Sequence, residues 1–241
     1  MLVQIKETQK LKLKNPIIVE GFPGIGMIGT IASSYLADKL GAKLIGNIAS
    51  PYFPPIAAIH DYKPVFPARI YASEKHNAIL IFSEFVIPAN VVTPLSDELY
   101  KYAKAKKAKA IYSLAGIAVP EPADTIHGIA STDKMAGLLK KNKVELIKEG
   151  ATQGVSGLLI AQCASVNFPA ANLMAQTNQP MDPKAAARLI EKLSEVTGIK
   201  IETKSLVQEG EKIEGKMRDA MEKMKESHSN YQEMEKNQAY A

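Results

Sequence analysis

The sequence contains no tryptophan and only one cysteine, Cys163, among its 241 residues. A lone cysteine cannot form a disulfide within the chain, so a reducing compartment is favoured and a cytoplasmic protein is predicted. The N-terminal segment alternates apolar and charged residues and lacks the apolar core of a signal peptide. Because no apolar run approaches the roughly 18 residues of a membrane span, we expect no membrane partner.

Motifs that carry metal or nucleophile chemistry are also missing. The histidines are isolated and have no partner at the spacing of metal ligands: His60, His76, His127 and His228. The stretch GVSGL resembles a G-x-S-x-G nucleophile elbow, but Leu158 stands where that motif requires glycine. The sequence therefore predicts no catalytic residue, no metal and no cofactor.

The charge balance gives little support to a nucleic-acid partner. The net charge is +5, and the nearest approach to a basic run, Lys101 to Lys109, falls within a helical pattern. A nucleic-acid interface would need a concentrated basic stripe with aromatic platforms. We therefore interpret this run as a solvated helix face and expect no nucleic-acid partner.

Strand-like and helix-like segments alternate along residues 1–204. Apolar strands are predicted at 16–20, 43–50, 110–116, 144–148 and 171–177. Helices are predicted at 26–40, 92–107, 133–142, 155–166 and 183–197, the last one capped by Asp182 and Gly198. Three short runs within 51–85, divided by turn signals, predict antiparallel strands. The alternation predicts a three-layer α/β/α sandwich with a mostly parallel central sheet and some antiparallel strands.

The composition changes after Ser205, where charged residues and methionines become frequent and proline disappears. Steps of four and three residues define an apolar seam that includes Ile213, Met217 and Met224. We predict that residues 205–238 form a helical, coiled-coil-like arm that projects from the domain or pairs between subunits. The alternative is a helix that lies back on its own domain.

Gly24, Gly26 and Gly29 form the pattern G-x-G-x-x-G, which in other proteins cradles a dinucleotide pyrophosphate. In such a site the first glycine follows the strand directly, and an acidic residue about twenty positions later binds the ribose. Here three residues separate the strand from Gly24, and the next predicted strand ends without an acid. We therefore interpret Gly24 and Gly26 as allowing unusual backbone angles, and Gly29 as allowing the helix to approach the sheet closely.

Four polar residues fall near predicted strand ends, where α/β proteins tend to place their sites: Glu84, Glu121, Asp124 and His127. The sequence does not decide whether these side chains converge. One functional alternative is therefore a small-molecule enzyme, acting on a nucleoside or an ester, that uses the loops near Gly24, Glu121 and Gly154.

The last three residues, Ala239, Tyr240 and Ala241, carry the most specific signal in the sequence. A hydrophobic residue, a tyrosine and a final residue with its free carboxylate form the tail by which activators and assembly factors dock on proteasome core particles. The carboxylate can pair with a lysine, and the phenol can pack on the wall of a pocket. Alanine buries little apolar area, so one such tail would bind weakly.

Dispersed blocks of the chain resemble the proteasome-assembly-chaperone family, specifically the archaeal homologues of the second assembly chaperone. The resemblance runs from about residue 16 to 203 and rests on GFPGIGMIGTIASSYLADKLGAKLIG, SPYFPPI, YSLAGIAVPEP, HGIASTDK, GATQGVSGLL and DPKAAARLIEKLSEVTGI. It implies a three-layer α/β/α domain that forms homo-oligomers, with a tetramer favoured and other rings possible. It also favours the interpretation of the glycine-rich turn as architecture.

Family members with such a tail resemble ATP-independent activators or chaperones of the core proteasome. The resemblance therefore implies that residues 239–241 dock on the α-ring of the 20S proteasome. Members without the tail exist as well, and a further alternative is a scaffold whose tail is merely disordered.

Overall fold

The computed structural model describes residues 2–208 and ten residues beyond them: 210, 215, 218, 219, 222, 223, 225, 226, 229 and 233. The predicted seam residues Ile213, Met217 and Met224 lie outside the described residues. So does the predicted docking tail, residues 239–241. The arm and the tail therefore stay predictions.

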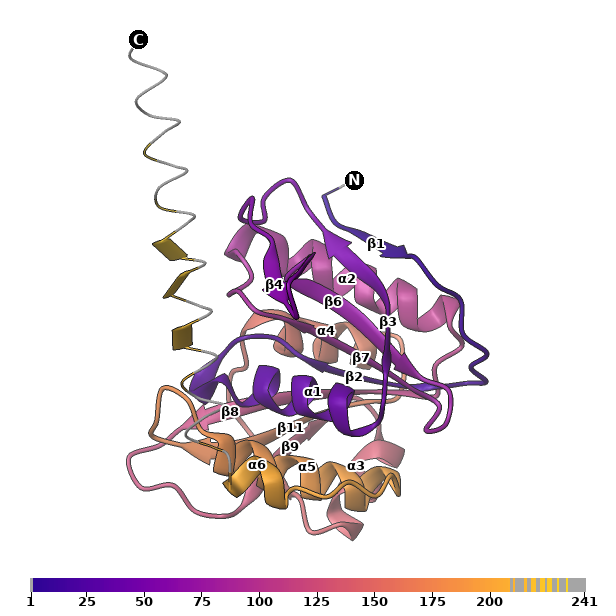
Figure 1. Cartoon of the computed structure of the whole chain (residues 1–241). Coiled ribbons are helices and arrows are strands. Elements are labelled where there is room, and N and C mark those ends of the chain that lie inside the picture. The colour runs from indigo at the N-terminus through magenta and orange to yellow at the C-terminus, as the bar shows by residue number, and fades with distance from the viewer. Residues whose placement is uncertain are drawn as a thin grey trace.

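A nine-stranded sheet forms the middle layer of the domain, in the order β1-β3-β6-β7-β2-β8-β11-β9-β10 (Figure 1). Its strands are β1 (Gln4–Glu7), β2 (Ile17–Gly21), β3 (Lys43–Ala49), β6 (Ala68–Ser73), β7 (Ala78–Ser83), β8 (Ala110–Ala118), β9 (Ile126–Ala130), β10 (Glu145–Leu146) and β11 (Ala170–Thr177). The four central strands β7, β2, β8 and β11 are parallel. Antiparallel pairs flank them on both sides, through β6 and β9.

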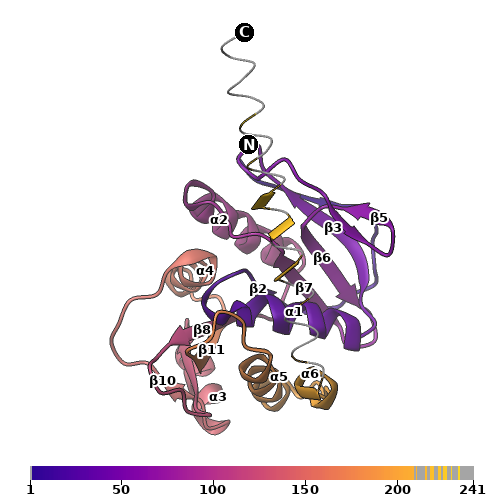
Figure 2. The same ribbon diagram turned by 60° about the vertical axis from the view of Figure 1, so that its left-hand side comes forward.

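Helices cover both faces of this sheet, as Figure 2 shows. One face carries α1 (Ile28–Lys39), α3 (Asp133–Lys141), α5 (Pro183–Thr197) and the short α6 (Lys204–Gln208), and the other carries α2 (Ala89–Ala105) and α4 (Gly154–Ser165). Each interface encloses its own cluster of buried apolar side chains. The predicted α/β/α sandwich is confirmed, with the parallel pairing concentrated in the centre of the sheet. Within the described residues, no helix has the length and apolar character needed to cross a membrane.

The predicted boundaries of α5 are confirmed by its caps. The Asp182 side chain accepts a hydrogen bond from the amide of Ala185 at 2.8 Å, and Pro183 occupies the first turn, where it sacrifices no helical hydrogen bond. Gly198 ends the helix in the left-handed region at φ +77°. Local chemistry therefore determines both ends of this helix.

Two strands of the large sheet have no counterpart among the predicted ones. Residues 126–130 form β9, although Gly128 and the short length give them a weak strand pattern. Residues 4–7 form the edge strand β1, which α2 secures: the Glu7 carboxylate accepts from the Tyr102 hydroxyl at 2.6 Å and from Lys106 at 2.7 Å. Tertiary contacts therefore stabilise β1 more than its own sequence does.

The region predicted to hold three antiparallel runs contains four strands. β6 and β7 join the large sheet, whereas β4 (Ala58–His60) and β5 (Lys63–Val65) form a separate two-stranded hairpin. Asp61 and Tyr62 connect β4 and β5, both with positive φ, at 47° and 65°. Two successive residues in this region are typical of a tight turn whose twist matches that of the hairpin.

Glycines let α1 approach the sheet until backbone meets backbone. A Cβ atom on Gly29 of α1 would lie 2.2 Å from the Leu114 carbonyl oxygen of β8. A Cβ atom on Gly21 of β2 would lie 2.0 Å from the Gly29 carbonyl oxygen. Neither neighbour is a flexible side chain, so no larger residue fits without moving the helix.

We expect Gly29→Ala to lower the free energy of unfolding by about 2 kcal/mol or more, because its methyl group would collide with the main chain of β8. Gly137→Ala in α3 is the matched control. No atom outside its own helix and chain neighbours lies within 4 Å of that Cβ position, so the change should stabilise the helix by up to about 1 kcal/mol. Urea denaturation followed by circular dichroism measures both. Equal stability of Gly29→Ala and the wild type would contradict this packing.

Candidate functional site

The glycine-rich turn follows the carboxyl end of β2, at the edge of the sheet where the parallel strands end. Gly26 has φ +64°, within the left-handed region that favours glycine. Gly24 has φ −161°, which is extended backbone open to any residue, so the special angle predicted for Gly24 is not found. Of these two glycines, only Gly26 therefore adopts a backbone conformation that favours glycine over other residues.

The turn is packed against the connection between β11 and α5. The amide of Asp182 donates to the Gly26 carbonyl oxygen at 3.0 Å, and the Asp182 carboxylate accepts from the Thr177 hydroxyl at 2.7 Å. A Cβ atom on Gly116 of β8 would lie 2.3 Å from the Ile25 carbonyl oxygen, so β8 also touches the turn. Contacts within the protein therefore determine the conformation of the turn.

A row of polar side chains crosses the other face of the sheet, beneath α4. The strand registers place Glu20 of β2 beside Ser113 of β8, and Ser113 beside Asn172 of β11. All three residues are buried, with at most 1% of their surface exposed. Within the described residues, no hydrogen-bond partner reaches the Glu20 carboxylate oxygens, the Ser113 hydroxyl or the Asn172 carbonyl oxygen. We refer to Glu20, Ser113 and Asn172 as the buried polar row.

Glu20 has the most perturbed environment in this row. Burial raises the pKa of its carboxyl group to about 7, and the nearby hydroxyls of Ser113 and Ser156 and the amide of Phe22 lower it by less. Ser156 lies in the first turn of α4, so the carboxyl group is enclosed between the sheet and the start of that helix. With no exposed surface, Glu20 offers no site of attack on a substrate.

A second buried polar cluster lies at the carboxyl end of β7. The Arg69 guanidinium pairs with the Glu84 carboxylate, which also pairs with Nε2 of His60 at 2.8 Å. Arg69 is nearly inaccessible, and its guanidinium carbon lies 5.8 Å and 5.4 Å from the ring centres of Tyr71 and Phe82. Through His60 this cluster connects the β4–β5 hairpin to the large sheet.

The structure does not bring together the four polar residues predicted near strand ends: three of them have separate partners, and the fourth, Glu121, is exposed. Glu84 pairs with Arg69, and Glu121 is exposed on the loop after β8. Asp124 is also exposed and pairs with Arg188 at 3.3 Å. No group of three His, Cys, Asp or Glu side chains among the described residues could hold a metal ion.

His127 also has a partner that occupies its ring nitrogen. The side-chain nitrogen of Gln176 lies 2.7 Å from Nε2 of His127, and the Gln176 oxygen accepts from the amide of Ala123 at 2.8 Å. Because that oxygen is an acceptor, the Gln176 nitrogen donates to His127. The Nε2 lone pair is therefore engaged and is not free to act as a base in this conformation.

The thiol of the single cysteine has low reactivity. Cys163 is buried on α4, and burial raises the pKa of its thiol to about 12. The reactive thiolate is therefore scarce at neutral pH.

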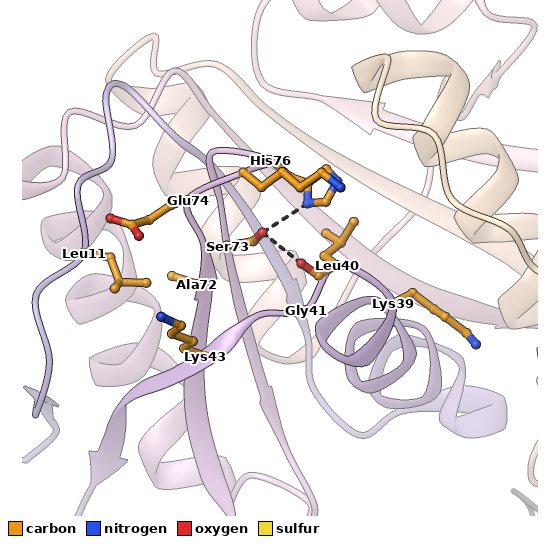
Figure 3. Close-up of a pocket in the computed structure, with 10 residues that line it drawn as sticks. Leu11, Lys39, Leu40, Gly41, Lys43, Ala72, Ser73, Glu74 and His76 are labelled. Atoms are coloured by element: carbon orange, nitrogen blue, oxygen red, sulfur yellow. Dashed lines mark hydrogen bonds between the residues drawn. The ribbon is translucent and has the colours of Figure 1, made fainter.

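A pocket of about 430 Å³ opens at the opposite edge of the sheet, between the end of α1 and the turn after β6 (Figure 3). Its lining residues are Leu11, Lys39, Leu40, Gly41, Lys43, Ala72, Ser73, Glu74, Lys75 and His76. The Ser73 hydroxyl donates to the Leu40 carbonyl oxygen at 2.9 Å, which satisfies one carbonyl group at the helix end. Basic side chains are favoured beside a helix C-terminus, which accounts for Lys39 in the last turn of α1.

Sequence reasoning singled out Glu84 but missed its pairing with Arg69, and it missed the buried polar row altogether. Glu20 ends a predicted strand, and Ser113 and Asn172 lie within two other predicted strands, where the sequence analysis did not single them out. The available signal was a polar residue in each of three mostly apolar predicted strands. Only the strand registers reveal that these residues are neighbours.

Comparison with known proteins identifies the family. The model of the PAC2 family matches residues 18–221. The chain belongs to the PAC2 family. This match confirms the resemblance seen in the sequence blocks.

Solved structures of archaeal proteins share the fold of this domain. Pyrococcus furiosus PbaA, described as an archaeal homolog of proteasome-assembly chaperone, is 30% identical with a TM-score of 0.83, covering 93% of this chain and 99% of PbaA. P. furiosus PbaB, described as an archaeal proteasome activator, is 20% identical with a TM-score of 0.77, and the match covers 90% of this chain and 98% of PbaB.

A sequence relative matches over a similar length. An uncharacterized protein of Methanocaldococcus jannaschii is 30% identical over 217 residues, which is 90% of each chain.

We expect the stability of the Glu20→Gln variant relative to the wild type to depend on pH. The folded state holds the Glu20 proton with a pKa of about 7, against an ordinary value of 4.5, so ionisation penalises folding as pH rises from 4.5 to 7. Glutamine stays neutral. The variant should therefore gain about 3 kcal/mol relative to the wild type between pH 4.5 and pH 8.

Urea titrations at several pH values measure this difference, and Glu121→Gln, which removes an exposed carboxylate, is the control. A constant offset between Glu20→Gln and the wild type over this pH range would refute the assignment of a neutral buried acid.

We expect Glu84→Gln to destabilise the domain by about 3 kcal/mol, because it leaves the buried Arg69 charge without its counter-ion. His60→Gln should cost less than about 1 kcal/mol, since the His60 side chain is 48% exposed. Chemical denaturation of both variants tests the contrast. Similar losses of unfolding free energy for Glu84→Gln and His60→Gln would show that burial of the Arg69 charge does not depend on Glu84 as its counter-ion.

Proposed function

We propose that this protein is a proteasome-binding chaperone or ATP-independent activator that docks on the α-ring of the 20S core through Ala239, Tyr240 and Ala241. The observation that carries the proposal is the similarity to PbaA, an archaeal homolog of proteasome-assembly chaperone, over 93% of this chain. The hydrophobic-tyrosine-any sequence at residues 239–241 supports the mode of docking.

Several copies of the tail would have to act together. One Ala-Tyr-Ala tail buries little apolar area, so its single-site affinity is low. Tails on one scaffold raise one another's effective concentration, and avidity then exceeds single-site affinity by factors of roughly 10²–10⁴. The proposal therefore includes a homo-oligomer, a tetramer or another ring, with arms formed by residues 205–238.

The arm would present the tails and strengthen the oligomer. Its proposed seam comprises Ile213, Met217 and Met224, spaced as in a coiled coil. Docking would either open the gate of the core to unfolded substrates or hold α-subunits together during assembly.

The geometry gives the enzyme alternative little support. Near Gly154 the Ser156 hydroxyl lies close to the Glu20 carboxyl group, but this pair is enclosed between the sheet and α4. Glu20 is fully buried, and the Nε2 lone pair of His127 is engaged by Gln176. The proteasome proposal is therefore the one to test first.

We expect the full chain to stimulate hydrolysis of fluorogenic peptides and of an unfolded protein by a purified archaeal 20S core without nucleotide. A chain ending at Gln238 should give no stimulation, because it lacks the carboxylate and the phenol that dock. The measurement is the initial rate of hydrolysis at increasing concentrations of each chain.

A chain with one glycine added after Ala241 is the matched control. It keeps every residue but moves the carboxylate away from the tyrosine, so it should also fail to stimulate. Stimulation by the chain ending at Gln238 would overturn docking through the tail. No effect of any chain would overturn the activator function and direct attention to assembly intermediates.

A further inference from the structure

The chain turns back after α5 and runs along that helix toward its start. Gly198 ends α5 in the left-handed region, and α6 then lies beside α5, as Figures 1 and 2 both show. We refer to residues 199–208 as the strap. Ile199 and Ile201 begin the strap and pack against the apolar cluster on this face of the sheet. The strap is therefore part of the domain.

Two contacts fix the direction of the strap. The Thr203 hydroxyl donates to the Glu191 carboxylate, in the middle of α5. Farther along the chain, a Cβ atom on Gly210 would lie 3.4 Å from the Pro183 side chain, in the first turn of α5. The chain thus advances from the middle of α5 to its start, antiparallel to the helix.

An apolar anchor holds α6 on the domain. Leu206 has no exposed surface and belongs to the same apolar cluster as the buried side chains of α1 and α5. Its neighbour Val207 is 44% exposed. A helix as short as α6 does not form in water by its own propensity, so its stability depends on the burial of Leu206.

Tyr35 binds the strap to α1. Its hydroxyl donates to the Glu202 carbonyl oxygen at 2.8 Å and lies 2.6 Å from the Ser205 hydroxyl. Because a phenol has only one hydrogen, the Ser205 hydroxyl is the donor in the second bond. The strap is therefore held by α1 through Tyr35 and by α5 through Glu191.

The strap changes the place at which the chain leaves the domain. α5 has 15 residues and is therefore about 22 Å long, with Pro183 at its start and Gly198 at its end. Pro183 follows Asp182, whose amide binds the glycine-rich turn at the carboxyl edge of the parallel strands. With the strap in place the chain reaches this edge. Without the strap, the chain would leave from the other end of α5.

We propose that the strap sets the point at which the proposed arm leaves the domain, with Tyr35 and Leu206 as the positioning residues. Residues 205–208, which begin that arm, lie on the domain, and the rest of the arm departs beyond them. The inference rests on the proposed function for the role of the arm. Tails gain avidity only where the scaffold lets them bind at the same time, so a displaced departure point removes that gain.

A disulfide tests the course of the chain on the protein alone. The Cβ distance of 3.4 Å between positions 210 and 183 is close to the roughly 3.5–4.5 Å of disulfide bonds. In oxidised glutathione, Gly210→Cys with Pro183→Cys should form an intramolecular bond at least ~10-fold faster than Gly215→Cys with Pro183→Cys. No part of the domain lies within 4 Å of a Cβ atom at Gly215. Cys163 is buried and does not compete, and mass spectrometry follows the bond.

Tyr35→Phe with Leu206→Ala, the release variant, removes the hydroxyl that binds the strap and most of its apolar anchor. In this background the cysteines at 183 and 210 should cross-link at least ~10-fold more slowly, because the strap opens locally. Val207→Ala, at the exposed neighbour of Leu206, is the matched control and should change the rate less than ~2-fold. Leu206→Met keeps the apolar anchor and should retain the wild-type rate. Circular dichroism confirms that each variant is folded.

The 20S assay then tests what the departure point does. The release variant should need at least ~10-fold more protein for half-maximal stimulation, because its tails lose avidity. Adding the cysteines at 183 and 210 to the release variant should restore the wild-type concentration when they are oxidised and not when they are reduced. A loss that came only from unfolding would instead follow the folded fraction, which circular dichroism measures on the same samples.

Equal cross-linking at positions 210 and 215, or a release variant that cross-links as fast as its parent, would overturn the inference. Full stimulation by a release variant whose cross-linking is slow would also overturn it, while the proposed function would stand. If position 210 cross-links fast but the wild type fails to stimulate the 20S core, the proposed function falls and the placement of the chain by the strap stands.

Discussion

The direct packing of α1 on the backbone of β2 and β8 is the constraint on which the rest of the structure depends. Gly21 and Gly29 leave no side chain between helix and sheet at that point, so the helix axis is fixed by main-chain contact. The start of α1 is fixed in turn by the glycine-rich turn, whose Gly26 carbonyl binds the amide of Asp182 at the start of α5. These main-chain contacts thereby position α1 and α5 in the same helix layer, and repacking of side chains cannot compensate for their loss.

The same strand end also serves the other helix layer. Glu20 and Gly21 are adjacent in β2, and successive residues of a strand point to opposite faces. Gly21 meets α1, whereas Glu20 lies beneath the first turn of α4, close to Ser156. The buried acid is tolerated because a neutral carboxyl group costs far less to bury than a charged one, and its raised pKa favours that form. The two helix layers are thus coupled through two consecutive residues.

The sequence allowed prediction of the features that local chemistry determines. The caps of α5 and the alternation of strands and helices are encoded within a few residues of where they appear, and the close approach of α1 is signalled locally by Gly29, although its partner is Leu114 of β8. β1 and β9 were missed because contacts from distant elements stabilise them, such as the bonds of Glu7 with Tyr102 and Lys106. The buried polar row was missed because its members lie in three strands whose registers no local pattern reveals.

The carboxyl edge of the parallel strands gathers the features that matter for assembly. The β4–β5 hairpin is anchored at the end of β7 by the pair of His60 with Glu84, and a Cβ atom on Gly210 would lie 3.4 Å from Pro183, at the start of α5 and just beyond the end of β11. The chain therefore passes this edge on its way to the proposed arm and tail. Avidity requires that linked sites be engaged at the same time, so for the proposed function the point at which each arm leaves its domain matters more than the strength of any single tail.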